Sequence, residues 1–213
     1  MHWADFAAQT LSQRGNKHII ASGITPSGEF HIGHLREILT GDMVTRACKD
    51  AGMDAEFVFI VDSADQLRKV YPFLSDSYEQ YIGCALATIP APDENGNPGN
   101  DGRSYAEHFL EPFLAALEQI DVRPRIIDNY TSYANGEFAE KSRIACEKAH
   151  EIREIIERVS SRELASDWFP YNPYGHNGSL DGVTVTGFEW PYVHWTQDGK
   201  PGKSDLNNAD GKL

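Results

Sequence analysis

The hydrophobic pattern near the start of the chain predicts a β-strand, a turn and an α-helix in succession. A short apolar run at 18–22 is followed by Gly, Pro and Ser, and apolar side chains then recur at helical spacing from Ile32 to Ala47. Gly52 suits the position just past a helix because glycine adopts the left-handed conformation without strain. A continuous apolar run at 55–62 is typical of a buried strand of a parallel sheet. Together they predict a right-handed βαβ unit of a Rossmann-like fold.

The rest of the chain shows weaker hydrophobic patterns, some with the spacing of a helix and some with the alternation of a strand. We expect helices at 1–15, 104–120 and 135–164, and strands at 123–129, 183–186 and 190–195. Ser104 and Glu107 have the spacing of a capping box at the start of the second of these helices. Gly187 and the pair at 198–199 are expected at turns, and so are residues 200–204. Residues 71–104 have no regular pattern.

Composition excludes some classes of protein and leaves others open. The hydrophobic fraction of 40% and the charged fraction of 24% are ordinary for a globular protein. No apolar run approaches the roughly 20 residues that cross a bilayer, so we expect a cytoplasmic protein without membrane association. The net charge of −13 disfavours non-specific binding to nucleic acid by this chain as a whole. The three cysteines are far apart, and we expect reduced thiols.

The predicted turn and helix contain the first candidate site. His31 and His34 flank Gly33 where the helix begins. Unpaired backbone N–H groups and the positive end of the helix dipole favour an anion at such a position. Gly33 has no side chain, so that a flat ring or a phosphate can approach the backbone closely.

The run around these histidines resembles class I lysyl-tRNA synthetase. His31-Ile32-Gly33-His34 is the His-Ile-Gly-His signature of class I aminoacyl-tRNA synthetases and related nucleotidyltransferases. The residues before it (Ser22 to Gly28) and after it (Leu35 to Glu37), with the segments 2–5 and 104–109, narrow the resemblance to the lysine enzyme. It covers essentially the whole chain, but only the N-terminal catalytic part of a typical family member.

The resemblance implies an α/β fold, in which a Rossmann-like half-domain carries a small inserted α+β connective subdomain. On this basis we divide the chain at residues 84 and 165. Residues 1–84 are expected to form the first half of the nucleotide-binding domain. Residues 85–165 are expected to be a helical continuation with a strand near 124–129, and 166–213 a β-rich insertion cut short by the chain end.

The resemblance also implies roles for individual residues. The catalytic residues implied are His31, Gly33 and His34. ATP is expected at Pro26, Ser27, Gly28, His31, Gly33 and His34, with Mg²⁺ as its counter-ion. The substrate lysine is expected at Gly23, Thr25 and Glu37, where Glu37 would face the side-chain ammonium. The alternative for Glu37 is a surface acid stabilised only by the helix dipole.

Two carboxylates follow the second predicted strand. Asp62 and Asp65 are three residues apart at its carboxyl end, where ligands bind in open α/β sheets. They are a possible acidic site for an amine or a metal-bound nucleotide. Capping of the next helix explains them equally well, with a contribution of about 1 kcal/mol.

Two departures from the family matter. The second catalytic signature, Lys-Met-Ser-Lys-Ser, is absent, and residues 210–213, where the chain ends, correspond to a point inside the insertion of relatives. Relatives often carry a cysteine-ligated zinc ribbon near residue 170, but residues 166–213 contain no cysteine, and His176 and His194 alone cannot complete a set of four ligands. We therefore expect no metal site and an insertion held by Trp and Tyr packing.

Three functions remain possible from the sequence. The first is the N-terminal part of a lysine–tRNA ligase, which forms lysyl-adenylate and transfers lysine to tRNA-Lys in the intact enzyme. The second is a stand-alone nucleotidyltransferase that adenylylates another small acid, and the third is a non-catalytic synthetase paralogue. Because the segment that completes the lysine site in relatives is missing from this sequence, we expect this chain alone to show no lysine-dependent pyrophosphate exchange.

Overall fold

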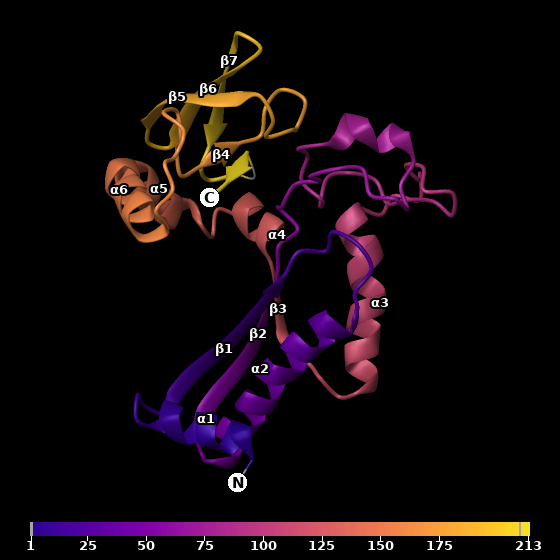
Figure 1. Ribbon diagram of the computed structural model, residues 1–213, viewed down its shortest axis with the longest axis vertical. Helices are drawn as coiled ribbons and strands as arrows, with labels where there is room; N and C mark the ends of the chain where they lie inside the picture. The colour runs from indigo at the N-terminus through magenta and orange to yellow at the C-terminus, as the bar shows by residue number, and fades with distance from the viewer. Residues whose placement is uncertain (1, 209) are drawn as a thin grey trace. The chain divides into compact units, whose positions relative to one another are not determined.

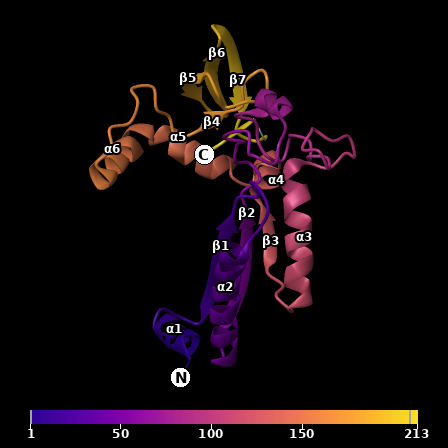
Figure 2. The ribbon, with the colours of Figure 1, turned by 45° about the vertical axis from the view of Figure 1, so that its right-hand side comes forward.

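The computed structural model describes residues 2–208 and 210–213, which form two compact units (Figures 1 and 2). The first unit contains the chain up to Ser63 together with residues 90–92 and 99–129. The second contains residues 64–89, 93–98 and 130–213. The domain boundaries expected from the sequence, at 84 and 165, remain a prediction.

A three-stranded parallel sheet forms the centre of the first unit. Its order is β1 (Lys17–Ile24), β2 (Asp54–Val61) and β3 (Arg125–Asp128), and the register places Ile24 opposite Val61 and Val61 opposite Asp128. The three carboxyl ends therefore lie at one edge. Helix α2 (Ile32–Asp50) connects β1 to β2, and α3 (Tyr105–Gln119) precedes β3 (Figure 1). This arrangement confirms the Rossmann-like half-domain.

The core of the first unit lies on one face of this sheet. Alternate side chains of β2 pack against apolar residues of α2 and α3; this cluster contains Ile24, Ile38, Phe57, Phe59, Val61, Phe113, Leu117 and Val122. Helix α2 approaches closely because Gly41 faces the Phe57 ring, which a Cβ would meet at 2.4 Å. On the opposite face, Ile19 and Ile60 are 62% and 37% exposed. Helix α1 (Trp3–Ser12) packs through Ala4 and Ala8 against Ala47 and Cys48 of α2.

The second unit combines helices with antiparallel strands. Its helices are η1 (Asp76–Tyr81), α4 (Asn129–Ala134), α5 (Ala139–Glu147) and α6 (Ala149–Ser160). Its strands are β4 (Asn172–Pro173), β5 (Val183–Glu189), β6 (Tyr192–Gln197), β7 (Lys200–Asp205) and β8 (Gly211–Lys212). The order of the larger sheet is β5-β6-β7, and β4 pairs with β8. Tyr171, Val193 and Leu206 pack with Cys146 in its core.

Several local predictions are confirmed and three are wrong. The helix at 104–120 and the strand at 123–129 correspond to α3 and β3. The long helix expected at 135–164 is wrong, because Gly136 takes a φ of +70° before α5 and Lys148 leaves helical geometry between α5 and α6. Residues 200–204 form strand β7 instead of a turn, since Gly202 lets the strand lie against the Trp195 ring. Gly187 lies at a bulge within β5 and not at a turn.

Two further findings concern the cysteines and the lengths of the helices. The three cysteines are buried and unpaired with one another, and burial raises the pKa of each thiol. In the part of the chain that the structure describes, no helix is long and apolar enough to span a bilayer.

Candidate nucleotide-binding site

The two histidines of the signature form a reciprocal cap at the start of α2. His31 is the N-cap residue, and its Nδ1 accepts a hydrogen bond from the Gly33 N–H at 3.1 Å. The N–H of His31 in turn donates to Nδ1 of His34 at 3.1 Å. The rings stack with centroids 3.9 Å apart. Histidine thus takes both roles that Ser and Glu play in an ordinary capping box.

This cap fixes the tautomer of both rings. Because each Nδ1 accepts a backbone hydrogen bond, the proton of the neutral ring is on Nε2, which becomes a donor. Burial, and then the neighbouring His31, lower the pKa of His34, although Glu37 acts to raise it. His34 is therefore neutral near pH 7. His34 thus offers an N–H donor instead of a positive charge.

The backbone has a smaller part at this helix start than the sequence indicated. The N–H groups of His31 and Gly33 donate to the two rings, and those of His34 and Leu35 donate to the carbonyl of His31. These four backbone donors are used within the chain. The donors left for a ligand at this helix start are therefore mainly those of the imidazole Nε2 atoms.

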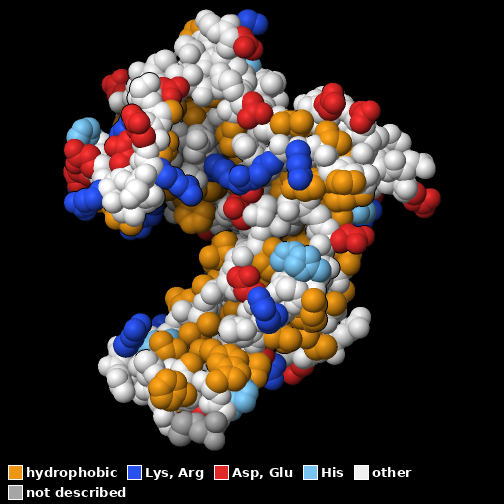
Figure 3. Space-filling model, in the orientation of Figure 1, with side chains coloured by type: hydrophobic (Ala, Val, Ile, Leu, Met, Phe, Trp, Pro, Cys, Tyr) orange, Lys and Arg blue, Asp and Glu red, His pale blue; other side chains and the backbone are white. Residues whose placement is uncertain are grey.

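A groove of about 600 Å³ runs from this helix start along α2. Its lining residues are Ile32, Gly33, Arg36, Leu39, Thr40 and Met43. The molecular face in Figure 3 shows histidine side chains at the surface, with apolar side chains beside them. Gly33 is required here by the cap itself, because a Cβ would lie 2.8 Å from the His31 ring. An apolar groove next to two N–H donors fits a base and its phosphates.

The turn before the signature is anchored by α3. Pro26 is fully buried, and the Tyr105 hydroxyl donates to the Ser27 carbonyl at 2.8 Å. Phe30 stacks on Phe113 of α3 at 4.3 Å and contacts the His34 ring edge to face at 5.1 Å. Sequence reasoning missed Tyr105 and Phe113. The only available signal was the capping box that places Tyr105 at the first position of α3.

The three residues expected to bind the amino acid lie around the carboxyl end of β1. Glu37 accepts a hydrogen bond from the Ser22 hydroxyl at 3.0 Å, which holds its carboxylate beside that strand end. Gly23 is exposed, and a Cβ there would make only ordinary contacts of 3.5–3.6 Å with Ile60. The packing of the chain does not require this glycine. Thr25 follows directly after the strand.

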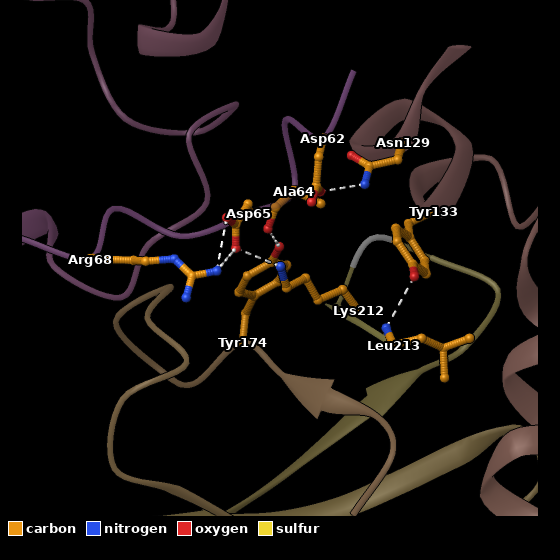
Figure 4. A network of polar contacts seen from close by, with 9 residues as sticks. All are labelled: Asp62, Ala64, Asp65, Arg68, Asn129, Tyr133, Tyr174, Lys212 and Leu213. Carbon is orange, nitrogen blue, oxygen red and sulfur yellow. Dashed lines mark hydrogen bonds and ion pairs between the residues drawn. The ribbon is translucent and has the colours of Figure 1, made fainter. Parts of the chain in front are cut away.

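Asp62 and Asp65 have different hydrogen-bond partners. Within the first unit, Asp62 accepts a hydrogen bond from the Asn129 amide (Figure 4). Within the second unit, Asp65 is 7% exposed and forms ion pairs with Lys212 at 2.9 Å and Arg68 at 3.0 Å (Figure 4). Burial acts to raise the pKa of Asp65, but the hydrogen bonds from Lys212 and Arg68 outweigh it and lower the pKa. Asp65 is thus neutralised by its own partners.

The described part of the chain contains no group of three or more His, Cys, Asp or Glu side chains that could hold a metal ion. Asp62 and Asp65, the two acids suggested by the sequence, each have their own partners within the described residues. A divalent cation at the groove would therefore depend on phosphate oxygens for its ligands.

Comparison with known proteins identifies the family of this chain. The family model described as tRNA synthetases class I (K) matches residues 1–213. A lysine–tRNA ligase of Methanosarcina barkeri is 43% identical over 89% of this chain and 34% of its own length. Those of Picrophilus torridus and Archaeoglobus fulgidus are 39% and 41% identical, over 100% and 93% of this chain. The chain spans only 34–41% of the length of these three relatives.

Proposed function

The chain belongs to the class I tRNA synthetase (K) family, and we propose that it forms the part of a lysine–tRNA ligase that binds ATP and lysine. The observation that carries the proposal is the stacked pair of His31 and His34, with both Nε2–H groups as donors, beside the Glu37 carboxylate. This combination supplies donors for phosphates and an acceptor for an ammonium group.

In the reaction we propose, a carboxylate oxygen of lysine attacks the α-phosphorus of ATP. The bond between the α-phosphorus and the bridging oxygen breaks, and pyrophosphate leaves with the electron pair. No proton needs to move to or from a side chain, so catalysis rests on positioning and on charge stabilisation. The Nε2–H groups of His31 and His34 donate to phosphate oxygens as negative charge shifts toward pyrophosphate. Mg²⁺ bound to the nucleotide supplies further charge neutralisation.

We assign lysine to the end of β1. Glu37, held there by Ser22, accepts hydrogen bonds from the side-chain ammonium of lysine. Gly23 leaves space above the strand for the amino acid, which explains a glycine that the packing of the chain does not need. Pro26, Ser27 and Gly28 form the turn that the nucleotide follows, with Ser27 held by Tyr105.

The second step and the partners follow from the same proposal. The whole protein would transfer lysine from the adenylate to tRNA-Lys in the cytoplasm, without membrane association. The segment 166–213 would need no zinc, because it contains no cysteine and has a core with Trp195 and Tyr171 buried.

Calorimetric binding of a non-hydrolysable lysyl-adenylate analogue tests the proposal. We expect residues 1–213 to bind the lysyl analogue, and Glu37→Gln to weaken this binding at least tenfold while ATP binding changes less than threefold. The control is Glu56→Gln, which alters a carboxylate on the same sheet paired with Arg125. Equal binding of analogues carrying other amino acids would contradict the lysine assignment. Absence of any analogue binding would contradict the nucleotide site.

A further inference from the structure

A cavity of about 300 Å³ lies in the second unit, with lining residues on strands β6 and β7. Its aromatic, hydroxyl and charged lining residues are Tyr130, Tyr174, Trp195, Lys203, Ser204 and Asp210. The other lining residues are small, and two of them are glycines, Gly175 and Gly178. One cation and one carboxylate therefore share a small cavity with aromatic side chains. The proposed reaction makes no use of this cavity.

We infer that this cavity binds a free α-amino acid as a zwitterion, outside the residues to which we assign the substrate lysine. Lys203 pairs with the carboxylate of the ligand, and Asp210 pairs with its ammonium group. The aromatic lining residues supply apolar contact surface for the side chain of the ligand. Pockets for small molecules have volumes of about 300–1,000 Å³, so this cavity is at the lower limit and fits an amino acid better than a nucleotide.

Both charged groups of the cavity retain the capacity to bind a ligand. Lys203 is exposed and makes no ion pair within residues 2–208 and 210–213; its ammonium lies 4.2 Å from the centre of the Tyr192 ring. The N–H of Asp205 donates to one oxygen of Asp210 at 3.1 Å, which positions that carboxylate and leaves its other oxygen for a ligand. The cavity therefore offers one positive and one negative partner, as the two ends of an amino acid require.

Hydrogen bonds within the second unit fix the aromatic walls of the cavity. The Trp195 indole N–H donates to the Ser204 hydroxyl at 2.9 Å, and both side chains are buried. The Tyr174 hydroxyl donates to the Ala64 carbonyl at 2.9 Å (Figure 4). These rings are therefore held in place before a ligand arrives. A preformed cavity binds a small ligand more tightly, because little conformational entropy of the walls is lost on binding.

The test is an NMR titration of residues 1–213 with the standard L-amino acids, one at a time, followed at the indole N–H of Trp195. We expect saturable binding of amino acids with apolar side chains and weaker binding of glycine. Lys203→Gln and Asp210→Asn should each weaken binding of the tightest amino acid at least tenfold. The matched controls are Lys200→Gln and Asp198→Asn, at exposed positions where β6 turns into β7 that do not line the cavity. They should change this affinity less than twofold.

Ligands that lack one end of the amino acid test each charged residue separately. The amine without the carboxylate should bind the parent chain at least tenfold more weakly than the amino acid does, and Lys203→Gln should bind the two equally. The acid without the ammonium group should behave in the same way with Asp210→Asn.

Three outcomes would overturn the site. The first is that no amino acid at millimolar concentration shifts the Trp195 resonance. The second is equal affinity in the lining and control variants. The third is loss of binding in Glu37→Gln, which would assign the signal to the proposed lysine position; we expect Glu37→Gln to leave this titration unchanged. Thermal unfolding of the variants, expected within about 2 °C of the parent, checks that they fold.

Discussion

Two polar clusters, one in each unit, differ in how completely their hydrogen bonds are satisfied within the chain. Around His31, His34 and Glu37 the hydrogen bonds within the chain use Nδ1 of each imidazole and one carboxylate oxygen, which leaves both Nε2 atoms and the other oxygen for a ligand. Around Asp65 both cations point inward at a carboxylate that is 7% exposed. The buried pair of Asp65 and Lys212 stabilises the fold, whereas a partly paired, more exposed cluster can bind a ligand.

The largest effect should come from removing the buried carboxylate. Asp65→Asn leaves Lys212 without its partner in a site where the two side chains are 9% and 16% exposed, and we expect a loss of about 3 kcal/mol in unfolding free energy. Urea unfolding followed by tryptophan fluorescence measures it, since three of the four tryptophans, at 168, 190 and 195, lie in this unit. The control is Asp54→Asn, an exposed pair with Lys17, expected to cost below about 1 kcal/mol. Equal losses of unfolding free energy in the two variants would contradict the difference between the buried and the exposed pair.

The same cluster predicts a response to acid. The pKa of Asp65 is lowered in the folded chain, so the stabilisation it gives is present above the ordinary aspartate pKa and is lost as pH falls through the lowered value. Unfolding free energy should therefore fall more steeply below pH 4 in the parent chain than in Asp65→Asn. If the unfolding free energies of the two proteins fell in parallel with pH, Asp65 would not be the source of the acid sensitivity.

Replacing the N-cap histidine should separate its two roles. His31→Ala removes the acceptor for the Gly33 N–H and should cost about 1 kcal/mol in unfolding free energy. His31→Asn restores a good capping side chain without an Nε2–H, so stability should return while affinity for ATP stays at least tenfold reduced. Ser104→Ala, which removes the corresponding cap of α3, is expected to lose similar stability. Recovery of ATP affinity in the asparagine variant would contradict the donor role.

A smaller effect is expected on the titration of His34. Burial, and then the neighbouring His31, lower the pKa of His34 below 6.5. The contribution of His34 to the unfolding free energy is therefore complete above pH 6.5 and decreases as the pH falls through the lowered pKa. Glu37→Gln removes a charge that raises the pKa and should lower it further. NMR titration of the imidazole protons measures this shift, with Asp42→Asn on the same helix as control. A rise in the pKa of His34 in Glu37→Gln would contradict the proximity of Glu37 to His34.

The smallest change in stability is expected at Gly23. A Cβ there meets only ordinary contacts, so Gly23→Ala should alter the melting temperature by less than about 3 °C, yet reduce binding of the lysyl-adenylate analogue. Gly41→Ala, whose Cβ would strike the Phe57 ring, should instead lower the melting temperature and leave the analogue bound in the folded fraction. A reversed pattern would show that Gly23 serves packing.

Local pattern was enough to predict most elements near the site. Apolar spacing places β1, α2 and β2, and the spacing of Ser104 and Glu107 places the start of α3. Contacts between distant residues were out of reach. The bond from Tyr105 to Ser27 joins positions 78 apart, and the stacking of Phe30 on Phe113 depends on the packing of α3. The tautomer of the histidines also depends on the cap geometry, which no spacing rule contains.

The histidine cap links formation of the site to formation of the helix. The hydrogen bonds that orient both rings are the same ones that close the first turn of α2, so the donors are aligned whenever that turn is folded. An anion arriving at this position does not have to order a flexible loop or freeze two imidazole rotamers. The conformational entropy of these side chains is lost once, during folding, and is not subtracted again from the free energy of binding.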